Sequence, residues 1–264
     1  LSRFNDYRMT NWFPVSYETA LVVAEGIKIY NLTEGAFDIT VGPLVNLWGF
    51  GPKGKKENIP TLKTINNLLE KVGSNHIKSR LYPPALKKEI ADLYVDLSGI
   101  AKGFGVDSIS NLLETKGITN YIDDIGGDIK TKGRKKNKSP WRIAIESPIL
   151  EKKEIQQVIN LSDQAIATSG DYRNYFEKEG KRYSHEINPK TGYPIQNRLA
   201  SVTVIDSSCM QADALATALI VLGPKEGYQL AEREDKAALF IIKGENGFFK
   251  KETTKFKRDY YDKE

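Results

Sequence analysis

Two oxygen-bearing side chains in the last third of the chain have a spacing that suits metal chemistry. Asp213 and Thr217 lie four residues apart in a segment that predicts the first turns of a helix, so their oxygens should share one face. Oxygen atoms on one helical face suit a hard cation. A structural interpretation also fits, in which Asp213 favours the positive helix end and Thr217 bonds its own backbone. Taken alone, the pair favours that structural interpretation.

One of the two histidines, His185, precedes a turn at residues 188–192, whose sequence is NPKTG. The Asn-Pro pair and the terminal glycine are turn chemistry, so His185 is predicted where a strand runs out into a loop. The stretch at residues 199–205 then predicts a buried strand.

A glycine-containing junction at residues 96–105 (DLSGIAKGFG) predicts the end of a strand and the start of a helix. Such a junction offers free backbone N–H groups and a positive helix end to an anion, and Lys102 adds a point charge. The spacing matches neither a Walker loop nor a Rossmann fingerprint. The alternative is a capped helix with Lys102 in solvent.

Small residues flank Phe37 and Asp38 at residues 35–43 (GAFDITVGP), a pattern that lets backbone approach a ligand closely. A glycine-bounded turn with Phe37 in the core explains the same residues. In the pair of strands predicted around the Gly-Gly break at 126–127, Asp128 could serve only that turn.

The rest of the chain predicts the elements that position these residues. Helices are expected at residues 16–30 and 61–72, from about 102 to 116, from Asp213 to Leu222, and on to about 232; a charged tail should end the chain. Short antiparallel strands are expected within 76–96, and further strands at 121–125, 142–146, 158–161, 165–170 and 238–242. Mixed strand pairing with interspersed helices predicts an α+β fold, with largely antiparallel sheets and flanking helices.

Composition excludes several classes of function. The 264 residues are 40% hydrophobic and 28% charged, which is ordinary for a globular chain. The net charge is +5, but the basic run at 130–138 lacks interleaved aromatic residues, so we expect a solvated surface and no nucleic-acid partner. The single cysteine, Cys209, excludes an internal disulfide and chemistry by cysteine pairs. No apolar run has the length of a membrane span, and no signal peptide is visible.

Six motifs in this order resemble the ApbE family, the FAD:protein FMN transferases, over nearly the whole chain. They are GAFDITVGP (35–43) with LWGFG (47–51), DLSGIAKG (96–103), GGD (126–128), ATSGD (167–171), SHEINPKTG (184–192) and ADALAT (212–217). The resemblance implies a single flavin transferase domain over residues 1–264, related to the T-fold. Because the chain opens on LSRFN without an initiator Met, the resemblance also implies that an N-terminal segment with part of the flavin site lies outside it.

The family's activity implies roles for individual residues. FAD is expected in a cleft with Mg²⁺ on its pyrophosphate, and FMN passes to a Ser or Thr hydroxyl of an acceptor protein while AMP leaves. His185 matches the family's proposed base. The remaining matched positions are Gly99, Asp213 and Thr217 for the metal, and Ala36, Phe37, Asp38, Asp96, Lys102 and Ile187 for FAD.

The resemblance further implies acceptors among the subunits of membrane redox complexes, such as the Na⁺-translocating NADH:quinone reductase type. It implies a periplasmic location, with a membrane or lipoprotein anchor in the missing segment. Glu186 departs from the family pattern, because an apolar or small residue is expected beside FAD phosphate. Three alternatives remain: a hydrolase giving FMN and AMP, a module that binds or stores FAD, and a structural domain that binds a partner.

Overall fold

The computed structural model of the protein describes residues 1–52, 59–148, 155–171, 174–178, 180–245 and 247–261. The chain divides into two compact units, each of which is described by itself below. Unit 1 comprises residues 1–99 and 174–196, and unit 2 comprises residues 100–173 and 197–264. The single domain expected over residues 1–264 stays a prediction.

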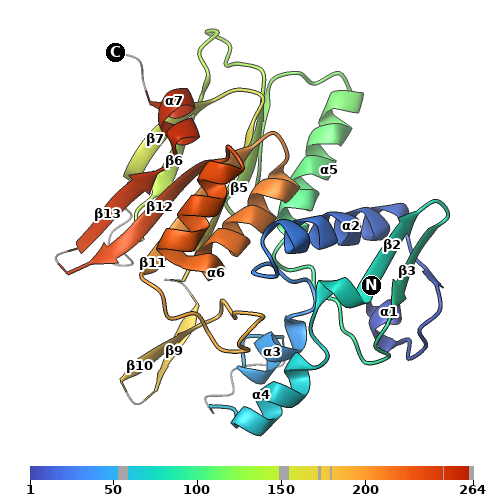
Figure 1. Ribbon diagram of the computed structural model, residues 1–264. Helices are drawn as coiled ribbons and strands as arrows, with labels where there is room; N and C mark the ends of the chain where they lie inside the picture. Colours follow the sequence, from blue (N-terminus) through green and yellow to red (C-terminus); the bar gives the residue numbers. More distant parts are fainter. Residues whose placement is uncertain (53–58, 149–154, 172–173, 179, 246, 262–264) are drawn as a thin grey trace. The chain divides into compact units, whose positions relative to one another are not determined.

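Unit 1 combines one helix of 16 residues and several shorter ones with two small antiparallel sheets (Figure 1). Its elements are α1 (Ser2–Asp6), β1 (Phe13–Pro14), α2 (Tyr17–Leu32), α3 (Gly42–Leu47), α4 (Leu62–Leu69), η1 (Ser74–His76), β2 (Ile77–Leu81), β3 (Pro84–Lys88), β9 (Tyr175–Lys178) and β10 (Lys181–Ser184). The sheets have the strand orders β1-β3-β2 and β10-β9, and α2 packs on β2 and β3. The two helices predicted here are confirmed, and the Ser16 and Thr61 side chains cap them by accepting bonds from backbone N–H groups.

Aromatic side chains from distant parts of the sequence form the core of unit 1. Trp48 is fully buried, stacks on Tyr183 with ring centroids 5.5 Å apart, and donates a 2.8 Å bond from Nε1 to the carbonyl O of Gly192. Phe176 also stacks on Tyr183, with ring centroids 5.0 Å apart. This packing ties the β9–β10 hairpin and the turn that follows it to α3, and so fixes the segment that contains His185.

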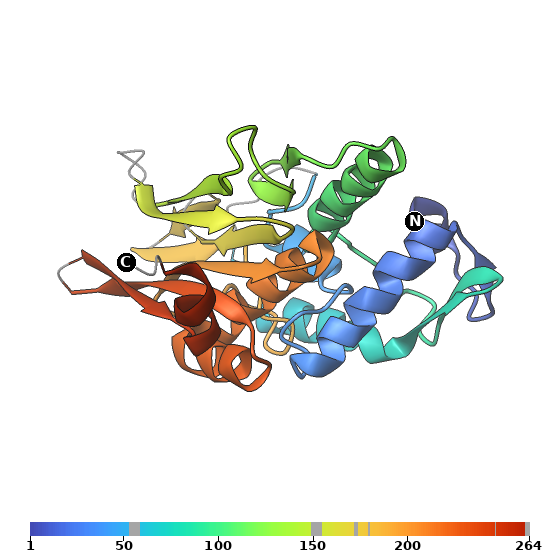
Figure 2. The same ribbon diagram turned by 90° about the horizontal axis from the view of Figure 1, so that it is seen from above.

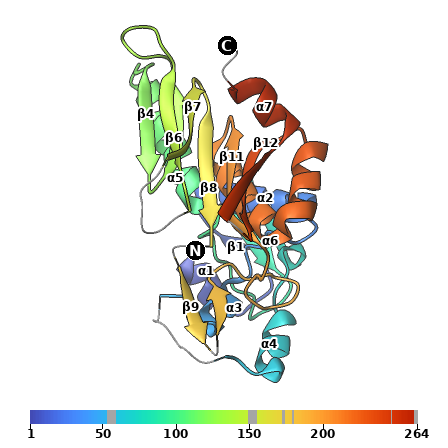
Figure 3. The ribbon, with the colours of Figure 1, turned by 90° about the vertical axis from the view of Figure 1, so that its left-hand side faces the viewer.

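Unit 2 is built on a six-stranded sheet (Figure 3) with the order β13-β12-β11-β8-β5-β4, in which every pairing is antiparallel. Its elements are α5 (Ala101–Thr115), β4 (Tyr121–Ile125), β5 (Asp128–Lys132), β6 (Trp141–Glu146), β7 (Ile155–Leu161), β8 (Ala165–Gly170), β11 (Leu199–Asp206), α6 (Cys209–Arg233), β12 (Ala237–Gly244), β13 (Gly247–Glu252) and α7 (Thr254–Tyr260). The predicted α+β class with largely antiparallel sheets is therefore confirmed.

The two faces of the large sheet carry different layers. Ile166 and Ser169 are three residues apart on β8 and so point to opposite faces. Ser169 contacts Thr217 of α6, and α5 packs beside α6 on β4 and β5. Ile166 packs instead in a core with side chains of β6, β7 and α7. Helix α6 thus crosses one face of the sheet, and the β6–β7 pair covers part of the other.

The C-terminal half of α6 and the tail show where sequence patterns succeed and fail. Gly223 has φ +85° inside α6, so the predicted end at Gly223-Pro224 appears as a kink followed by further helix. The charged-tail prediction was wrong, because these residues form β13 and α7 (Figure 2). Thr253 caps α7, and Phe256, a residue of α7, is fully buried. The many charged residues of this segment hid the apolar spacing that is typical of an amphipathic helix. Within the described residues, no helix is long and apolar enough to cross a membrane.

Candidate active site

The first three turns of α6 hold Asp213 and Thr217, which agrees with their predicted place near the start of a helix. Asp213 is 5% exposed, and its Oδ2 accepts a 3.0 Å bond from the backbone N–H of Gly103. Gly103 is the third residue of α5, whose first-turn N–H groups have no partner within their own helix. Asp213 therefore interacts with the positive end of α5, a partner that the structural interpretation did not include.

The hydroxyl of Thr217 is oriented from the sheet. Its Oγ1 lies 3.2 Å from the Oγ of Ser169 on β8, and either hydroxyl can donate. Ser169 belongs to the ATSGD motif, so the structure joins that motif to the ADALAT motif within unit 2.

Lys102 forms an ion pair that the sequence did not predict. Its Nζ lies 2.8 Å from Oδ2 of Asp128, which is 1% exposed. Burial by itself would lower the pKa of Lys102, but the bond to Asp128 and the negative charge of Asp213 outweigh burial and raise this pKa. Burial raises the pKa of the Asp128 carboxyl, and Lys102 opposes that effect. The interpretation that Asp128 serves only the turn was wrong, because Asp128 pairs with Lys102 and the Gly127 N–H of the turn is bonded by Asp124 at 2.9 Å. The Lys102 side chain is 46% exposed, which agrees with the alternative of a lysine in solvent, and the ion pair gives it a partner there.

The side chains of the Ala36–Phe37–Asp38 motif lie in the interior of unit 1. Ala36 and Phe37 are each 4% exposed. Oδ1 of Asp38 accepts bonds of 2.8 Å and 2.6 Å from the N–H and hydroxyl of Thr40, and one of 2.6 Å from the hydroxyl of Ser74. Burial raises the pKa of the Asp38 carboxyl, and these hydrogen bonds oppose the rise. The Asp38 side chain therefore organises the turn, and FAD contact by this motif stays a prediction.

The second motif of unit 1 packs directly against the first. The Asp96 N–H donates a 2.7 Å bond to the carbonyl O of Ile39, and Oδ1 of Asp96 accepts from Ser98 at 2.9 Å. A methyl group at Gly42 would lie 2.8 Å from Cβ of Asp96, so the close approach of the two segments requires glycine there. Two of the segments predicted to contact FAD therefore meet.

His185 lies one residue beyond β10, where the strand runs out into a loop as predicted. Its Nδ1 is 3.1 Å from the carbonyl O of Asn174, a geometry in which Nδ1–H donates and Nε2 is the atom that can accept a proton. Oε1 of Glu186 lies 3.5 Å from that Nε2, and the histidine side chain is 33% exposed. Ile187 is 4% exposed and forms a backbone bridge with Pro194, and its FAD contact stays a prediction.

The predicted residues thus fall into two groups. Unit 1 holds the Ala36–Asp38 motif with Asp96, the Gly99 carbonyl, and His185 with Ile187; unit 2 holds Lys102, Asp213 and Thr217. Each group is coherent within its unit, and the joining of the two groups around one FAD stays a prediction.

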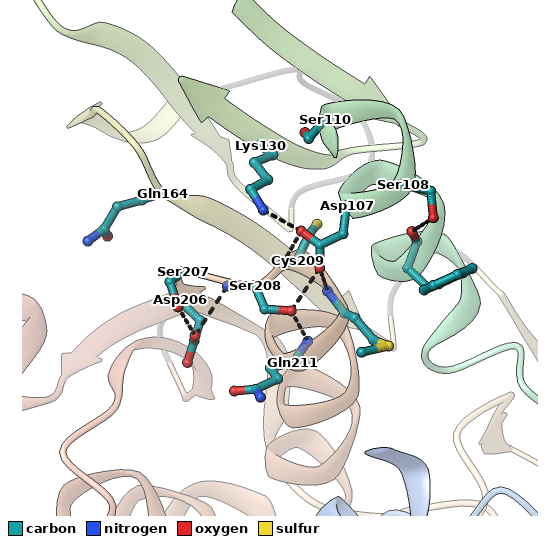
Figure 4. A network of polar contacts seen from close by, with 12 residues as sticks. Asp107, Ser108, Ser110, Lys130, Gln164, Asp206, Ser207, Ser208, Cys209 and Gln211 are labelled. Carbon is teal, nitrogen blue, oxygen red and sulfur yellow. Dashed lines mark hydrogen bonds and ion pairs between the residues drawn. The ribbon is translucent and has the colours of Figure 1, made fainter. Parts of the chain in front are cut away.

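One carboxylate that sequence analysis missed organises the start of α6 (Figure 4). Asp107 of α5 accepts bonds from the Ser208 hydroxyl at 2.7 Å and from the backbone N–H groups of Cys209 and Met210 at 3.1 Å and 3.0 Å. Lys130 lies 2.7 Å from the same carboxylate. No local pattern could have shown the contacts with α6, because Ser208, Cys209 and Met210 lie 101 to 103 residues beyond Asp107.

Two expectations about single residues have different outcomes. Placing Lys130 in a solvated run was wrong, because its side chain is 17% exposed and paired with Asp107. Cys209 is a free, fully buried cysteine, and burial raises the pKa of its thiol further above the physiological range. That burial is typical of a cysteine that packs in the core.

The oxygen atoms that Asp213 and Thr217 supply in unit 2 suit a Mg²⁺ ion that is bound partly by substrate phosphates. They are too few for a metal ion whose ligands all come from the protein. No group of three or more His, Cys, Asp or Glu residues that could hold a metal occurs among the described residues. Mg²⁺ is commonly held by one or two carboxylates together with substrate phosphates and water. One carboxylate and one hydroxyl, on adjacent turns of a helix, fit that pattern.

Comparison with known proteins gives a consistent result. The model of the ApbE family matches residues 1–241. The FAD:protein FMN transferase of Vibrio cholerae is 49% identical over 257 residues, which cover 97% of this chain and 76% of the relative; that of Escherichia coli K12 is 41% identical, with coverage of 94% and 71%. Among solved structures, the flavin transferase ApbE from Vibrio cholerae has a TM-score of 0.89 at 48% identity, covering 98% of this chain and 82% of that one. The ApbE protein from Thermotoga maritima has a TM-score of 0.86 at 30% identity, with coverage of 99% and 83%.

Proposed function

This chain is an enzyme of the ApbE family, and we propose that it transfers FMN from FAD to a Ser or Thr hydroxyl of an acceptor protein, using Mg²⁺ and releasing AMP. The observation that carries the proposal is the placement of Asp213 and Thr217. They lie on adjacent turns of α6, and Gly103 at the start of α5 bonds the Asp213 carboxylate. This arrangement suits a site that binds a pyrophosphate through a metal.

Each residue of the unit 2 group has a task in that reaction. Asp213 and Thr217 would hold the cation, and the Gly99 carbonyl, which belongs to unit 1, is the proposed third oxygen. Mg²⁺, when bound, neutralises charge that grows on the pyrophosphate. The positive end of α5 and the Lys102 ammonium group are positioned to attract phosphate oxygens.

The unit 1 group supplies the proton acceptor. The acceptor hydroxyl loses its proton to Nε2 of His185 as its oxygen forms a bond to the phosphorus on the riboflavin side of FAD. The bond between that phosphorus and the bridging oxygen breaks, and the oxygen leaves with AMP. The Asn174 carbonyl fixes the tautomer by accepting from Nδ1, and Glu186 lies where it can stabilise the imidazolium that forms.

We also propose acceptors among flavin-carrying subunits of membrane redox complexes, and a periplasmic location with membrane attachment through an upstream segment. The support for both is the family resemblance. The location can be tested by fractionating cells that express the protein. Absence of the protein from both the periplasmic and the membrane fractions would contradict the proposed location.

The decisive experiment combines the protein with FAD, Mg²⁺ and an acceptor peptide, and detects the products by mass spectrometry. An FMN adduct on Ser or Thr, together with AMP, is the expected result. Free FMN without an adduct would favour a hydrolase, and intact bound FAD would favour a binding module. Asp213→Ala should abolish both cleavage and transfer.

The chain offers a matched control for the base. His76 resembles His185 in exposure, 34% against 33%, and in the distance to a glutamate oxygen, 3.6 Å against 3.5 Å. We expect His185→Ala to bind FAD and lose acceptor labelling, and His76→Ala to label normally. Equal labelling by both variants would remove the base assignment from His185.

A further inference from the structure

We infer that Asp107 is a positioning residue for the Asp213/Thr217 pair, and that it acts through an exchange of carboxylate caps between α5 and α6. The effect on catalysis rests on the proposed function. The reciprocal capping of the two helices is a feature of unit 2 that can be tested separately.

The first half of the exchange runs from α5 to α6. Asp107 extends from α5 to the first turn of α6, where one carboxylate accepts bonds from the Ser208 hydroxyl, Cys209 N–H and Met210 N–H (Figure 4). Ser208 also caps the helix in the usual local way, by accepting from the Gln211 N–H at 3.3 Å. The local cap leaves first-turn N–H groups that water could bond. Their use of an α5 carboxylate instead ties the start of α6 to a neighbouring helix.

The second half runs in the opposite direction. Asp213, one turn further along α6, accepts from the Gly103 N–H in the first turn of α5. Each helix therefore gives a carboxylate to the N-terminal end of the other. Asp107 and Gly103 are four residues apart on α5, and Cys209 and Asp213 are four apart on α6, so the two contacts lie one turn apart along each helix.

The fit between the helices is tight at this point. A methyl group at Gly103 would lie 2.3 Å from the carbonyl O of Cys209 and 2.8 Å from Cβ of Asp213. Little displacement of α6 is possible without breaking one of the two contacts. Because Thr217 follows Asp213 by one turn, the position of both predicted metal ligands depends on the same pair of contacts.

Lys130 completes the arrangement by balancing charge. Its ammonium lies 2.7 Å from Asp107, with 17% of the lysine and 15% of the aspartate side chain exposed. A second carboxylate without a cation would repel phosphate close to the metal ligands. The ion pair lets Asp107 cap α6 with little net charge.

The test uses Asp107→Asn, which keeps the size of the side chain but replaces an acceptor oxygen with a donor. Hydrogen–deuterium exchange is measured without FAD or metal, and the Gly103 amide is the reporter because Asp107 does not bond it. We expect the Gly103 amide to exchange about tenfold faster, and the Mg²⁺ concentration for half-maximal transfer to rise about tenfold, the lower end of the range for residues that orient metal ligands.

Two controls separate positioning from general stability. The double variant Asp107→Asn/Lys130→Met also removes the Lys130 cation, which Asp107→Asn alone leaves without its partner. The double variant should recover stability but should not restore protection of the Gly103 amide. If Asp107→Asn alone fails to fold, the double variant takes its place in the test. Glu114→Gln changes another α5 carboxylate, which bonds Tyr121 at 2.9 Å, and should alter neither reporter.

Unchanged exchange at Gly103 in both Asp107 variants would overturn the inference, as would a Mg²⁺ requirement equal to that of the unsubstituted protein. If the unsubstituted protein shows no Mg²⁺-dependent transfer, the proposed function is refuted instead. The hydrogen–deuterium exchange of the Gly103 amide would still decide whether Asp107 positions Asp213.

Discussion

Replacing Gly103 with Ala should separate α5 from α6, although alanine is the better helix former. The added methyl would lie 2.3 Å from the Cys209 carbonyl O and 2.6 Å from its carbonyl carbon. These are backbone atoms and cannot move aside by a rotamer change, so α6 must shift by about 1 Å to reach ordinary van der Waals distance. The shift would also break the bond from the Gly103 N–H to Asp213.

The magnitude follows from three effects. Alanine gains about 1 kcal/mol in helix propensity over glycine. Overpacking costs about 1 to 3 kcal/mol, and loss of a hydrogen bond to a charged group costs about 1.5 to 3 kcal/mol. The costs exceed the gain, so the free energy of unfolding should fall by about 3 kcal/mol. A displacement of this size at Asp213 should also lower FMN transfer by about a hundredfold.

Gly105→Ala is the matched control, because Gly105 lies in the same helix. Its methyl would lie 3.2 Å from Cδ1 of Ile125, the far end of a flexible side chain that can move. Denaturant unfolding should therefore show Gly105→Ala unchanged or stabilised by up to about 1 kcal/mol. Equal stability of the Gly103 and Gly105 variants would refute the close-packing argument, and normal transfer by a destabilised Gly103→Ala would refute its link to the site.

Three further predictions concern buried charge and the metal. Asp38→Ala should lower the free energy of unfolding by about 3 kcal/mol, because the Thr40 and Ser74 donors lose their buried acceptor; a loss below about 1 kcal/mol in denaturant unfolding would contradict this. Lys102→Met leaves Asp128 buried without its cation, so the pKa of the Asp128 carboxyl, already raised by burial, should rise further. Below the unfolded value of 3.8 the carboxyl is protonated in both the folded and the unfolded state, so the variant should lose least stability there. The difference in free energy of unfolding between the unsubstituted protein and the variant should grow by about 1 kcal/mol from about pH 4 to pH 7. A flat difference across this range would show that the ion pair contributes little. Removing Mg²⁺ with a chelator should stop transfer and lower the melting temperature in the presence of FAD, and this temperature shift should be absent in Asp213→Ala.

Sequence patterns predicted elements well where the signal is local. The turn at Gly126 and Gly127 was found from its glycines, and both have positive φ, 61° and 93°. The helix end predicted at Gly223-Pro224, with a further helix after it, coincides with the kink in α6. Helix α7 was missed because charged residues masked its short apolar face, although Thr253 is an ordinary cap.

The site was less predictable, because its contacts join residues distant in sequence. The spacing of Asp213 and Thr217 placed both on α6, but nothing local showed that Gly103 bonds one and Ser169 the other. Asp107 gave no signal at all, since an aspartate within a helix is most often a solvated side chain. Carboxylates that cap another helix become visible only when the packing of the two helices is known.

The connectivity of unit 2 indicates why the His185 segment is present. Strands β8 and β11 are antiparallel neighbours, paired from Ser201 opposite Gly170 to Asp206 opposite Ala165. A short hairpin turn could join such strands. Instead the connection includes residues 174–196, which belong to unit 1 and contain His185 with the turn after it. The pairing of β8 with β11 does not need this insertion, so the segment is better explained by what it brings to unit 1. Its aromatic residues anchor on Trp48, and the anchored hairpin ends at the histidine. A long connection with a rigid core of its own is typical of a functional segment, and this independently favours a site role for His185 over a role in the sheet.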